Sequence, residues 1–396
     1  MEKKMKKIIK KLLPKKIKNF IIGYMNNQLI SNYFRKNHQK HALLSYILTP
    51  FKKDSLSHTN FYEAQSWAKI LDELGFNVDI IDYRNSKEID LLKYDLICGF
   101  GDIFQQYFES SYCKNIQTIY YGAGMHVCHQ NTATLQRVKD VRNKKGVWLG
   151  KSARFVEKTW THQTLLVDGI IALGNCVCAG SYQKYYGGIV YSLPAPFYET
   201  QNGENIIKQR TNLSKQHYLW FGSSGLIHKG LDLCLDYFSQ NQDIFLHICG
   251  PIENEKEFID VYKKELFESP NIKLHGFIDI DSKKFEAILV MCSFVIFPSC
   301  SEGGCPSTLT AIGNGGLIPI ITKETTIATG HEIWIERFNY ESIDKAIKQS
   351  QTLSFEEIEE LQYNNLNFVK TNHTQEIYYQ QLKTNIQKIL GINNDL

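Results

Sequence analysis

The chain has 396 residues, of which 43% are hydrophobic and 22% are charged, as expected for a soluble globular protein large enough for two domains. Its net charge of +4 is uneven, because residues 1–40 hold 12 of the 45 Lys and Arg residues but one of the 41 Asp and Glu residues, which leaves 33 basic and 40 acidic residues for the remainder. Ten cysteines without C-x-x-C pairs argue against a disulfide framework and a zinc site, and favour reduced thiols in the cytoplasm.

Residues 1–25 are predicted to form a basic amphipathic helix, because apolar side chains recur at helical spacing with lysines on the other face. No apolar run approaches the ~20 residues of a membrane-spanning helix, and lysines interrupt the core that a signal peptide needs. We expect this segment to bind an anionic membrane surface and to hold the protein at the inner face of the cytoplasmic membrane. A solvated basic tail is the alternative, and sparse aromatic residues argue against nucleic acid as a partner.

Residues 41–196 are predicted to form a doubly wound α/β domain that follows the basic segment 1–40. Short apolar runs predict its strands at 42–48, 77–83, 94–100 and 117–123, with two more in DGIIALGN and GIVYSLPAP. The helix between the first two strands is expected to begin with Asn60 and Glu63 in a capping box.

Ligands bind at the carboxyl ends of parallel strands, so the loops that follow these strands supply candidate residues. A ligand at these strand ends would lie in a cleft, and an acceptor substrate could bind there too. The candidates for these contacts are His58, Thr59, Asn60, Gly101, Asp102 and Arg137. Arg137, Arg142 and Arg154 are candidates for holding an anionic acceptor, with surface ion pairs as the alternative. His126 follows the fourth strand; it is either a site residue, a strand-end histidine bonded to the backbone, or part of a metal site with Cys128 and His129.

Residues 197–374 are predicted to form a second α/β domain, because Pro194 and Pro196 interrupt the pattern and a new series of strands and helices then begins. The sequence Asp279-Ile280-Asp281 is similar to a metal-binding D-x-D, but we interpret Asp281 as the N-cap of the next helix. No metal site is therefore predicted. The chain is expected to end in a helical stretch over 355–390.

The stretch 294–322 is predicted to form a strand, a polar loop, a helix and a second strand. Glu302 lies in the loop beside Gly303 and Gly304, and Pro306 opens the helix. Because the start of a helix presents free N–H groups and a positive dipole end, this loop is expected to bind an anion. An ordinary strand-to-helix turn with a solvated glutamate is the alternative.

This stretch resembles the donor-site signature of retaining GT-B glycosyltransferases of the group 1, or family 4, type: P-S, then E-G, a helix, and G-x-P-[IV]. The resemblance implies two Rossmann-like domains that face each other across a cleft, with a C-terminal helix at about 375–391 that crosses back to the first domain. In that family a first glutamate lies near the transferred sugar and a second, eight residues later, binds the ribose. Glu302 matches the first, and Thr310 stands at the second as a neutral, weaker partner.

The loop at 221–230 resembles the family's G-R-x4-K-G sequence, in which the Arg and the Lys bind the donor diphosphate. Lys229 matches, but Ser223 stands at the arginine position, so the hydroxyls or amides of Ser223, Ser224 and Gly225 are expected to replace it. The resemblance also places His126 near the donor sugar or phosphates, as a catalytic residue together with Glu302. The other donor-binding residues that it implies are Gly250, Gly276, Phe277, Gly303, Gly304, Cys305 and Ser307.

The resemblance thus predicts a hexosyltransferase-type glycosyltransferase that moves a sugar from a UDP or GDP donor to a hydroxyl of a surface polysaccharide or a lipid-linked saccharide, with retention. It needs no cofactor besides the nucleotide-sugar substrate. Two alternatives remain: a non-hydrolysing nucleotide-sugar epimerase, which shares this architecture, and a non-catalytic membrane scaffold. The departures at Ser223 and Thr310 permit the scaffold.

Overall fold

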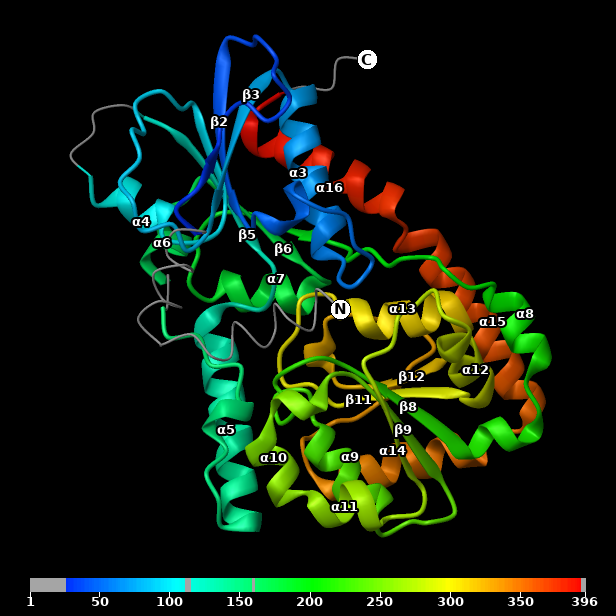
Figure 1. Cartoon of the computed structure of the whole chain (residues 1–396). Helices are drawn as coiled ribbons and strands as arrows, with labels where there is room; N and C mark the ends of the chain where they lie inside the picture. Colours follow the sequence, from blue (N-terminus) through cyan, green and yellow to red (C-terminus); the bar gives the residue numbers. More distant parts are fainter. Residues whose placement is uncertain (1–25, 111–114, 159–160, 393–396) are drawn as a thin grey trace, which may run out of the picture.

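The structure is a computed structural model, which describes residues 26–110, 115–158 and 161–392. Its two mainly parallel sheets each have helices on their faces, and they occupy the upper and lower parts of Figure 1. Both sheets are built from short runs of buried apolar residues, which is typical of parallel strands covered on both faces.

The first sheet has seven strands in the order β1-β3-β2-β4-β5-β6-β7, and all neighbours are parallel except the edge pair β1 and β3. The strands are β1 (Leu29–Ile30), β2 (Lys40–Tyr46), β3 (Phe76–Asp82), β4 (Leu96–Gly99), β5 (Gln117–Gly122), β6 (Gly169–Leu173) and β7 (Val190–Leu193). The helices of this half are α3 (Asn60–Glu73), α4 (Ile103–Phe108), α5 (Val127–Lys145), α6 (Thr161–Leu166) and α7 (Cys176–Gln183).

The second sheet has six parallel strands in the order β10-β9-β8-β11-β12-β13. The strands are β8 (His217–Phe221), β9 (Phe245–Cys249), β10 (Ile272–Gly276), β11 (Phe294–Phe297), β12 (Ile318–Ile321) and β13 (Ile333–Trp334). The helices are α8 (Gly203–Gln209), α9 (Leu231–Phe238), α10 (Lys256–Val261), α11 (Lys263–Glu268), α12 (Lys283–Met291), α13 (Pro306–Gly315) and α14 (Tyr340–Thr352).

The last two helices, α15 (Phe355–Asn372) and α16 (Gln375–Leu390), run from the second half back to the first. In Figure 1 the red α16 lies beside α3, and Lys383 Nζ binds Glu73 Oε2 at 2.8 Å. This arrangement confirms the predicted α/β fold of two Rossmann-like halves with a returning C-terminal helix. The single helical stretch expected over 355–390 is divided, because the chain leaves the helix at His373 and Thr374 caps the start of α16.

Two local predictions differ from the structure. Thr59, not Asn60, precedes α3, and Glu63 forms no capping box because its carboxylate accepts hydrogen bonds from Thr59, Tyr46 and Tyr121. Ser282, not Asp281, caps α12 by accepting the N–H of Phe285.

The described part of the basic segment expected over 1–40 belongs to the first sheet. Leu29 and Ile30 pair with β3, and the N–H of Tyr33 donates to the carbonyl of Val78 at 2.8 Å. Residues 1–25, on which the membrane-binding prediction rests, lie outside the described residues.

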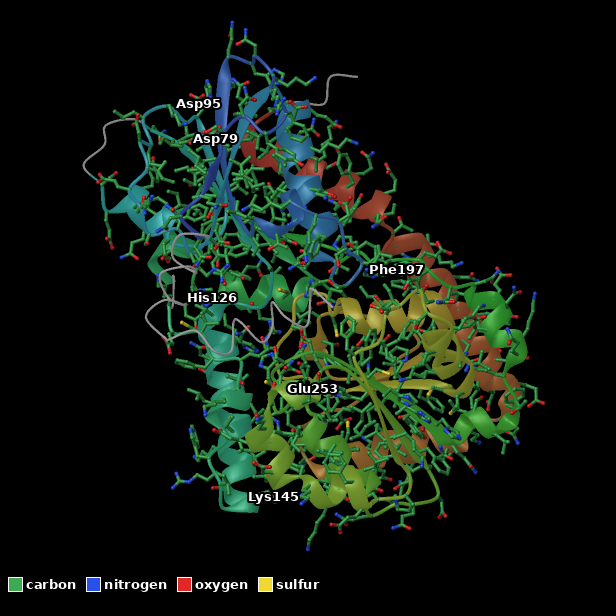
Figure 2. The ribbon with its side chains drawn as sticks, viewed as in Figure 1. Asp79, Asp95, His126, Lys145, Phe197 and Glu253 are labelled. Atoms are coloured by element: carbon green, nitrogen blue, oxygen red, sulfur yellow. The ribbon has the colours of Figure 1, made fainter. Side chains whose placement is uncertain are left out.

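Helix α5 belongs to the first half of the chain but extends along the second half, beside α10 (Figure 1). Figure 2 shows His126 at its beginning and Lys145 at its far end. Arg137 binds Asp232 of α9 at 2.5 Å, Lys144 binds Asp236 at 2.6 Å, and Lys145 binds Glu265 of α11 at 2.6 Å. These ion pairs connect the two halves at a distance from the segments where the chain passes from one half to the other.

Candidate functional site

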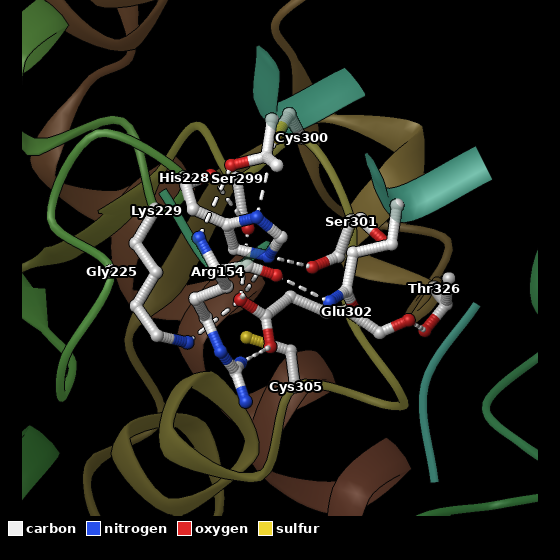
Figure 3. Close-up of polar contacts among 12 residues, drawn as sticks. Arg154, Gly225, His228, Lys229, Ser299, Cys300, Ser301, Glu302, Cys305 and Thr326 are labelled. Carbon is white, nitrogen blue, oxygen red and sulfur yellow. Dashed lines mark hydrogen bonds and ion pairs between the residues drawn. The ribbon is translucent and has the colours of Figure 1, made fainter. Parts of the chain in front are cut away.

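Glu302 is the centre of a buried charged cluster where the two halves meet (Figure 3). It lies in the loop between β11 and α13, and 8% of its surface is exposed. Its Oε1 accepts hydrogen bonds from Lys229 Nζ at 2.7 Å and from Ser299 Oγ at 2.9 Å. Arg154 Nη1 lies 3.8 Å from the other oxygen, Oε2. The carboxylate therefore contacts one cation from each half of the chain.

This carboxylate is ionised at neutral pH. Burial alone would raise the pKa of Glu302, but the charges of Lys229 and Arg154 outweigh burial and lower the pKa to about 2. His228 does not add a charge at neutral pH, because burial lowers its pKa to about 3. An anionic Glu302 could bond the hydroxyls of a sugar and stabilise positive charge near it.

His228 fixes the loop that carries Glu302. Its Nε2 lies 2.5 Å from the carbonyl oxygen of Ser301, so this nitrogen carries the proton and donates, while Nδ1 lies 3.6 Å from Cys300 Sγ. The backbone carbonyl of His228 accepts the N–H of Cys300 at 2.9 Å. Sequence reasoning did not single out His228, for which its position directly before Lys229 was the signal. Ser299 is the serine of the P-S sequence but was given no role.

Lys229 is placed by the turn between β8 and α9. Its ammonium lies 5.1 Å from the centre of the Phe297 ring, at the end of β11. Gly230 follows with φ +68°, and a Cβ there would lie 2.3 Å from the carbonyl oxygen of Pro298. Glycine is needed at this position because the turn and the end of β11 approach so closely. The close approach brings Lys229 to Glu302.

The amides expected to replace the missing arginine are only partly available. The N–H groups of Gly225 and Leu226 donate to the carboxylate of Glu255, while Ser223 and Ser224 are exposed. Glu255 thus occupies two amides of the turn in which a phosphate-binding group was expected.

Gly303 and Gly304 form a close contact between the two halves. A Cβ on Gly303 would lie 2.4 Å from the carbonyl oxygen of Ala123, and one on Gly304 would lie 2.3 Å from Cβ of Ala195. The N–H of Gly304 donates to Thr326 Oγ1 at 2.7 Å. The end of β5 therefore lies directly against the loop of Glu302, at the carboxyl ends of the strands, where ligands bind in such sheets.

The start of α13 is ordered by its own side chains. Cys305 is buried with φ +38°, and its Sγ lies 3.1 Å from Thr308 Oγ1. Ser307 is half-buried on the first turn. Thr310 is buried and donates its hydroxyl to the carbonyl of Pro306 at 2.8 Å, so lone pairs of its oxygen remain for a further donor.

The donor-base candidates lie in the turns after β9 and β10. Gly250 has φ +150°, and its N–H donates to the carbonyl of Gly276 at 2.8 Å. A Cβ on Gly250 would lie 1.9 Å from the carbonyl oxygen of Gly222, so this position needs glycine. Phe277 is exposed beside them.

In the first half, His58 lies close to the charged cluster. Its ring is exposed, yet its pKa is lowered by desolvation first, and then by Arg154 and Lys229, while Glu63 and Glu302 act in the opposite direction. His58 Nδ1 accepts the N–H of Asn60 at 3.1 Å, and Thr59 is buried against Glu63. The charges of Arg154, Lys229 and Glu302 therefore act on the pKa of His58, which is the link between this histidine and the charged cluster.

His126 has a different environment. It is buried at the start of α5, where Nδ1 accepts the N–H of Cys128 at 3.2 Å and Nε2 donates to Thr164 at 3.2 Å. Its ring stacks on Tyr185 with a centroid distance of 4.3 Å, and burial lowers its pKa to about 4. Both nitrogens are engaged, so the geometry is that of a strand-end histidine and we assign it no part in the site.

The remaining candidates of the first half are engaged elsewhere. Arg137 is buried in the ion pair with Asp232 and is not open to an acceptor. Asp102 pairs with Lys158. Gly101 has φ +111° at a position where a Cβ would lie 2.3 Å from the carbonyl oxygen of Tyr83.

Within the ranges 26–110, 115–158 and 161–392, no group of three His, Cys, Asp or Glu side chains is arranged to hold a metal ion. None of the helices in these ranges is long and apolar enough to cross a membrane.

The fold is similar to solved glycosyltransferase structures over about nine-tenths of the chain. Sucrose-phosphate synthase from Thermosynechococcus elongatus matches 90% of this chain and 100% of its own, with a TM-score of 0.61 and 13% identity. A glycosyltransferase from Rickettsia africae matches 90% of this chain and 100% of its own, with a TM-score of 0.58 and 11% identity. Anabaena HepE, in complex with UDP and glucose, matches 89% of this chain and 100% of its own, with a TM-score of 0.57 and 11% identity.

No protein-family model and no curated protein matches the sequence. At 11% and 13% identity, the solved structures establish the fold and not the activity. The chain therefore has the GT-B fold, with Glu302 and Lys229 in the loops of the second half that face the first.

Proposed function

We propose that this protein is a glycosyltransferase that moves a sugar from a nucleoside-diphosphate donor to a hydroxyl group of a saccharide acceptor. The observation that carries the proposal is the buried pair of Glu302 and Lys229, which lies between the two halves of a GT-B fold. The pair offers a carboxylate to a sugar and a cation to a diphosphate at one place. The fold neighbour HepE, which was solved with UDP and glucose, supports a nucleotide-sugar donor.

We propose the following roles for the site residues. Lys229 binds the diphosphate, and Glu302 bonds the donor sugar and stabilises the charge that develops at its ring. The first turn of α13, with Ser307, adds N–H groups at its positive end. Thr310 bonds the ribose, and His58 faces the sugar from the first half.

The donor base is held by the backbone of the turns at Gly250 and Gly276, beside Phe277. We propose transfer with retention, as in the family that the sequence resembles. The acceptor is a surface polysaccharide or a lipid-linked saccharide at the cytoplasmic membrane.

Nucleotide binding tests this proposal. UDP or GDP at about a hundred times its Kd should raise the free energy of unfolding by ~2.7 kcal/mol, measured as a thermal shift. Lys229→Ala should weaken the binding of the diphosphate by about 1–3 kcal/mol, because a charge-assisted hydrogen bond is lost. Lys283→Ala, which removes an exposed lysine on α12, is the matched control and should bind as the wild type does.

Two results would contradict the proposal. Absence of any shift with UDP, GDP, ADP and their sugars would favour a scaffold without nucleotide binding. Release of an epimerised sugar without an acceptor would favour an epimerase.

Membrane binding is proposed for residues 1–25. Nine of the lysines in the chain lie there with one acidic residue, and each basic residue near an anionic surface contributes about 1 kcal/mol. The full chain should therefore sediment with anionic vesicles at low salt and be released from them at high salt. It should not sediment with neutral vesicles. A chain that starts at Asn26 keeps β1 and the contacts of Tyr33, and should lose this binding. Equal sedimentation of the two chains would refute the idea.

A further inference from the structure

We propose that Arg154, carried by the first half of the chain, is the second cation that binds the donor diphosphate, opposite Lys229 of the second half. This inference rests on the proposed function. Arg154 lies in the loop between α5 and α6. From the sequence, the arginines of this basic region were expected to hold an anionic acceptor.

The first observation is that Arg154 and Lys229 contact different oxygens of Glu302. Lys229 Nζ binds Oε1 at 2.7 Å, whereas Arg154 Nη1 stays 3.8 Å from Oε2, beyond hydrogen-bond distance. The side chain of Arg154 is 46% exposed and that of Lys229 is 6% exposed. Arg154 is thus the less committed of the two cations, and its guanidinium is accessible to a ligand.

The second observation is that the backbone of Arg154 is fixed. Its carbonyl accepts Nε2 of Gln130 at 2.7 Å, and its N–H donates to Thr134 Oγ1 at 3.3 Å. Both partners lie on α5, which is bound to the second half by the ion pair of Arg137 and Asp232. The arginine is therefore held in place by a helix that is itself connected to the domain of Lys229.

The third observation is the fit between Arg154 and the turn before Lys229. A Cβ on Gly225, which has φ +87°, would lie 2.3 Å from Cγ of Arg154. The aliphatic part of the arginine therefore crosses the turn at a place that only glycine leaves open. The turn itself offers no side-chain cation besides Lys229, since Ser223 and Ser224 are neutral and Glu255 engages the amides of Gly225 and Leu226.

The charges at the site leave its two cations accessible to an anion. Arg154 and Lys229 share the carboxylate of Glu302, and His228 is neutral at pH 7. The second carboxylate nearby, that of Glu255, is engaged by the amides of Gly225 and Leu226. A diphosphate placed between Arg154 and Lys229 would meet one cation from each half, and guanidinium binds phosphate oxygens in pairs. Donor binding would thereby depend on the two halves being held together.

The test compares nucleotides that differ by one phosphate. UDP and UMP, with GDP and GMP where guanine is preferred, are titrated by calorimetry into the full-length wild type, Arg154→Ala and Arg154→Lys. Arg154→Ala should lower the affinity for UDP about tenfold or more, with a smaller loss for UMP. Arg154→Lys should recover part of the loss, because it keeps the charge without the paired donors. Lys151→Ala, which removes an exposed lysine of the same loop paired with Glu257, should bind UDP as the wild type does.

The outcomes separate the two proposals. If Lys229→Ala loses UDP affinity while Arg154→Ala keeps it, Arg154 has no part in the site and the proposed function stands. If Arg154→Ala loses UDP and UMP equally, its effect is not on the diphosphate and the inference is overturned. If the wild type binds none of these nucleotides, the proposed function fails and this inference fails with it. The melting temperatures of the free variants should match the wild type, because the guanidinium is half-exposed.

Discussion

Glu302→Gln is expected to lower the turnover of sugar transfer by a factor on the order of 10²–10³ or more. The variant should still bind the nucleotide. Glutamine has nearly the same shape and can still accept the hydroxyl of Ser299, but it carries no charge toward the donor sugar. The substitution also frees Lys229 from its counter-ion, so the affinity for UDP should stay unchanged or rise. Single-turnover transfer and calorimetry with UDP measure the two effects separately.

The controls for this prediction use charge and pH. Glu341→Gln removes an exposed carboxylate at the start of α14 and should leave transfer unchanged. Because the pKa of Glu302 is about 2, the wild type should keep the ionised form down to mildly acidic pH. In Lys229→Ala, loss of the largest lowering influence should raise this pKa and move the acid limb of transfer to higher pH. Wild-type turnover by Glu302→Gln would remove Glu302 from the mechanism.

The sequence predicts the part of the site that local pattern determines. The strand, loop and helix over 294–322 are recognisable because apolar runs flank a polar loop with Pro306 at the helix start, and Glu302 and Lys229 are then placed together in the structure. Both residues lie in loops that follow buried strands of one parallel sheet, β11 for Glu302 and β8 for Lys229, and the carboxyl ends of these strands share one edge.

The parts that sequence reasoning missed depend on contacts between distant segments. His126 and His58 both follow strands of the first sheet, and nothing in their neighbours distinguishes the histidine that stacks on Tyr185 from the one that lies near Glu302. Arg137 and Arg154 lie in one basic stretch, yet the first is buried against Asp232 and the second is half-exposed beside Glu302. The packing of α5 against the second half decides between these outcomes, and no short-range periodicity encodes it.

The buried ion pair between Arg137 of α5 and Asp232 of α9 gives the second large expectation, which concerns stability. Only 2% of the side chain of Arg137 and 3% of that of Asp232 are exposed, and the two lie 2.5 Å apart across the two halves. Arg137→Ala leaves a buried carboxylate without its cation, so the free energy of unfolding should fall by about 3–5 kcal/mol. Urea unfolding of the variant and the wild type at pH 7 measures the difference.

The pH dependence of that loss has a definite sign. Burial raises the pKa of Asp232 although Arg137 opposes it, and removal of Arg137 should raise it further. A folded carboxyl with a raised pKa binds its proton more tightly than the unfolded chain does, so its contribution to stability falls as pH rises through that pKa. The defect of Arg137→Ala should therefore be smallest at acidic pH, where Asp232 is protonated, and full at neutral pH.

The double variant Arg137→Met/Asp232→Leu is the decisive comparison for this pair. Replacing both charges by apolar side chains removes the uncompensated carboxylate, and such replacements are often neutral or stabilising, so the double variant should recover most of the stability that Arg137→Ala loses. Lys151→Ala breaks an exposed pair between the same two halves and should cost less than about 1 kcal/mol. If Arg137→Ala unfolds within about 1 kcal/mol of the wild type, water or another group compensates Asp232, and the pair does not hold the halves together.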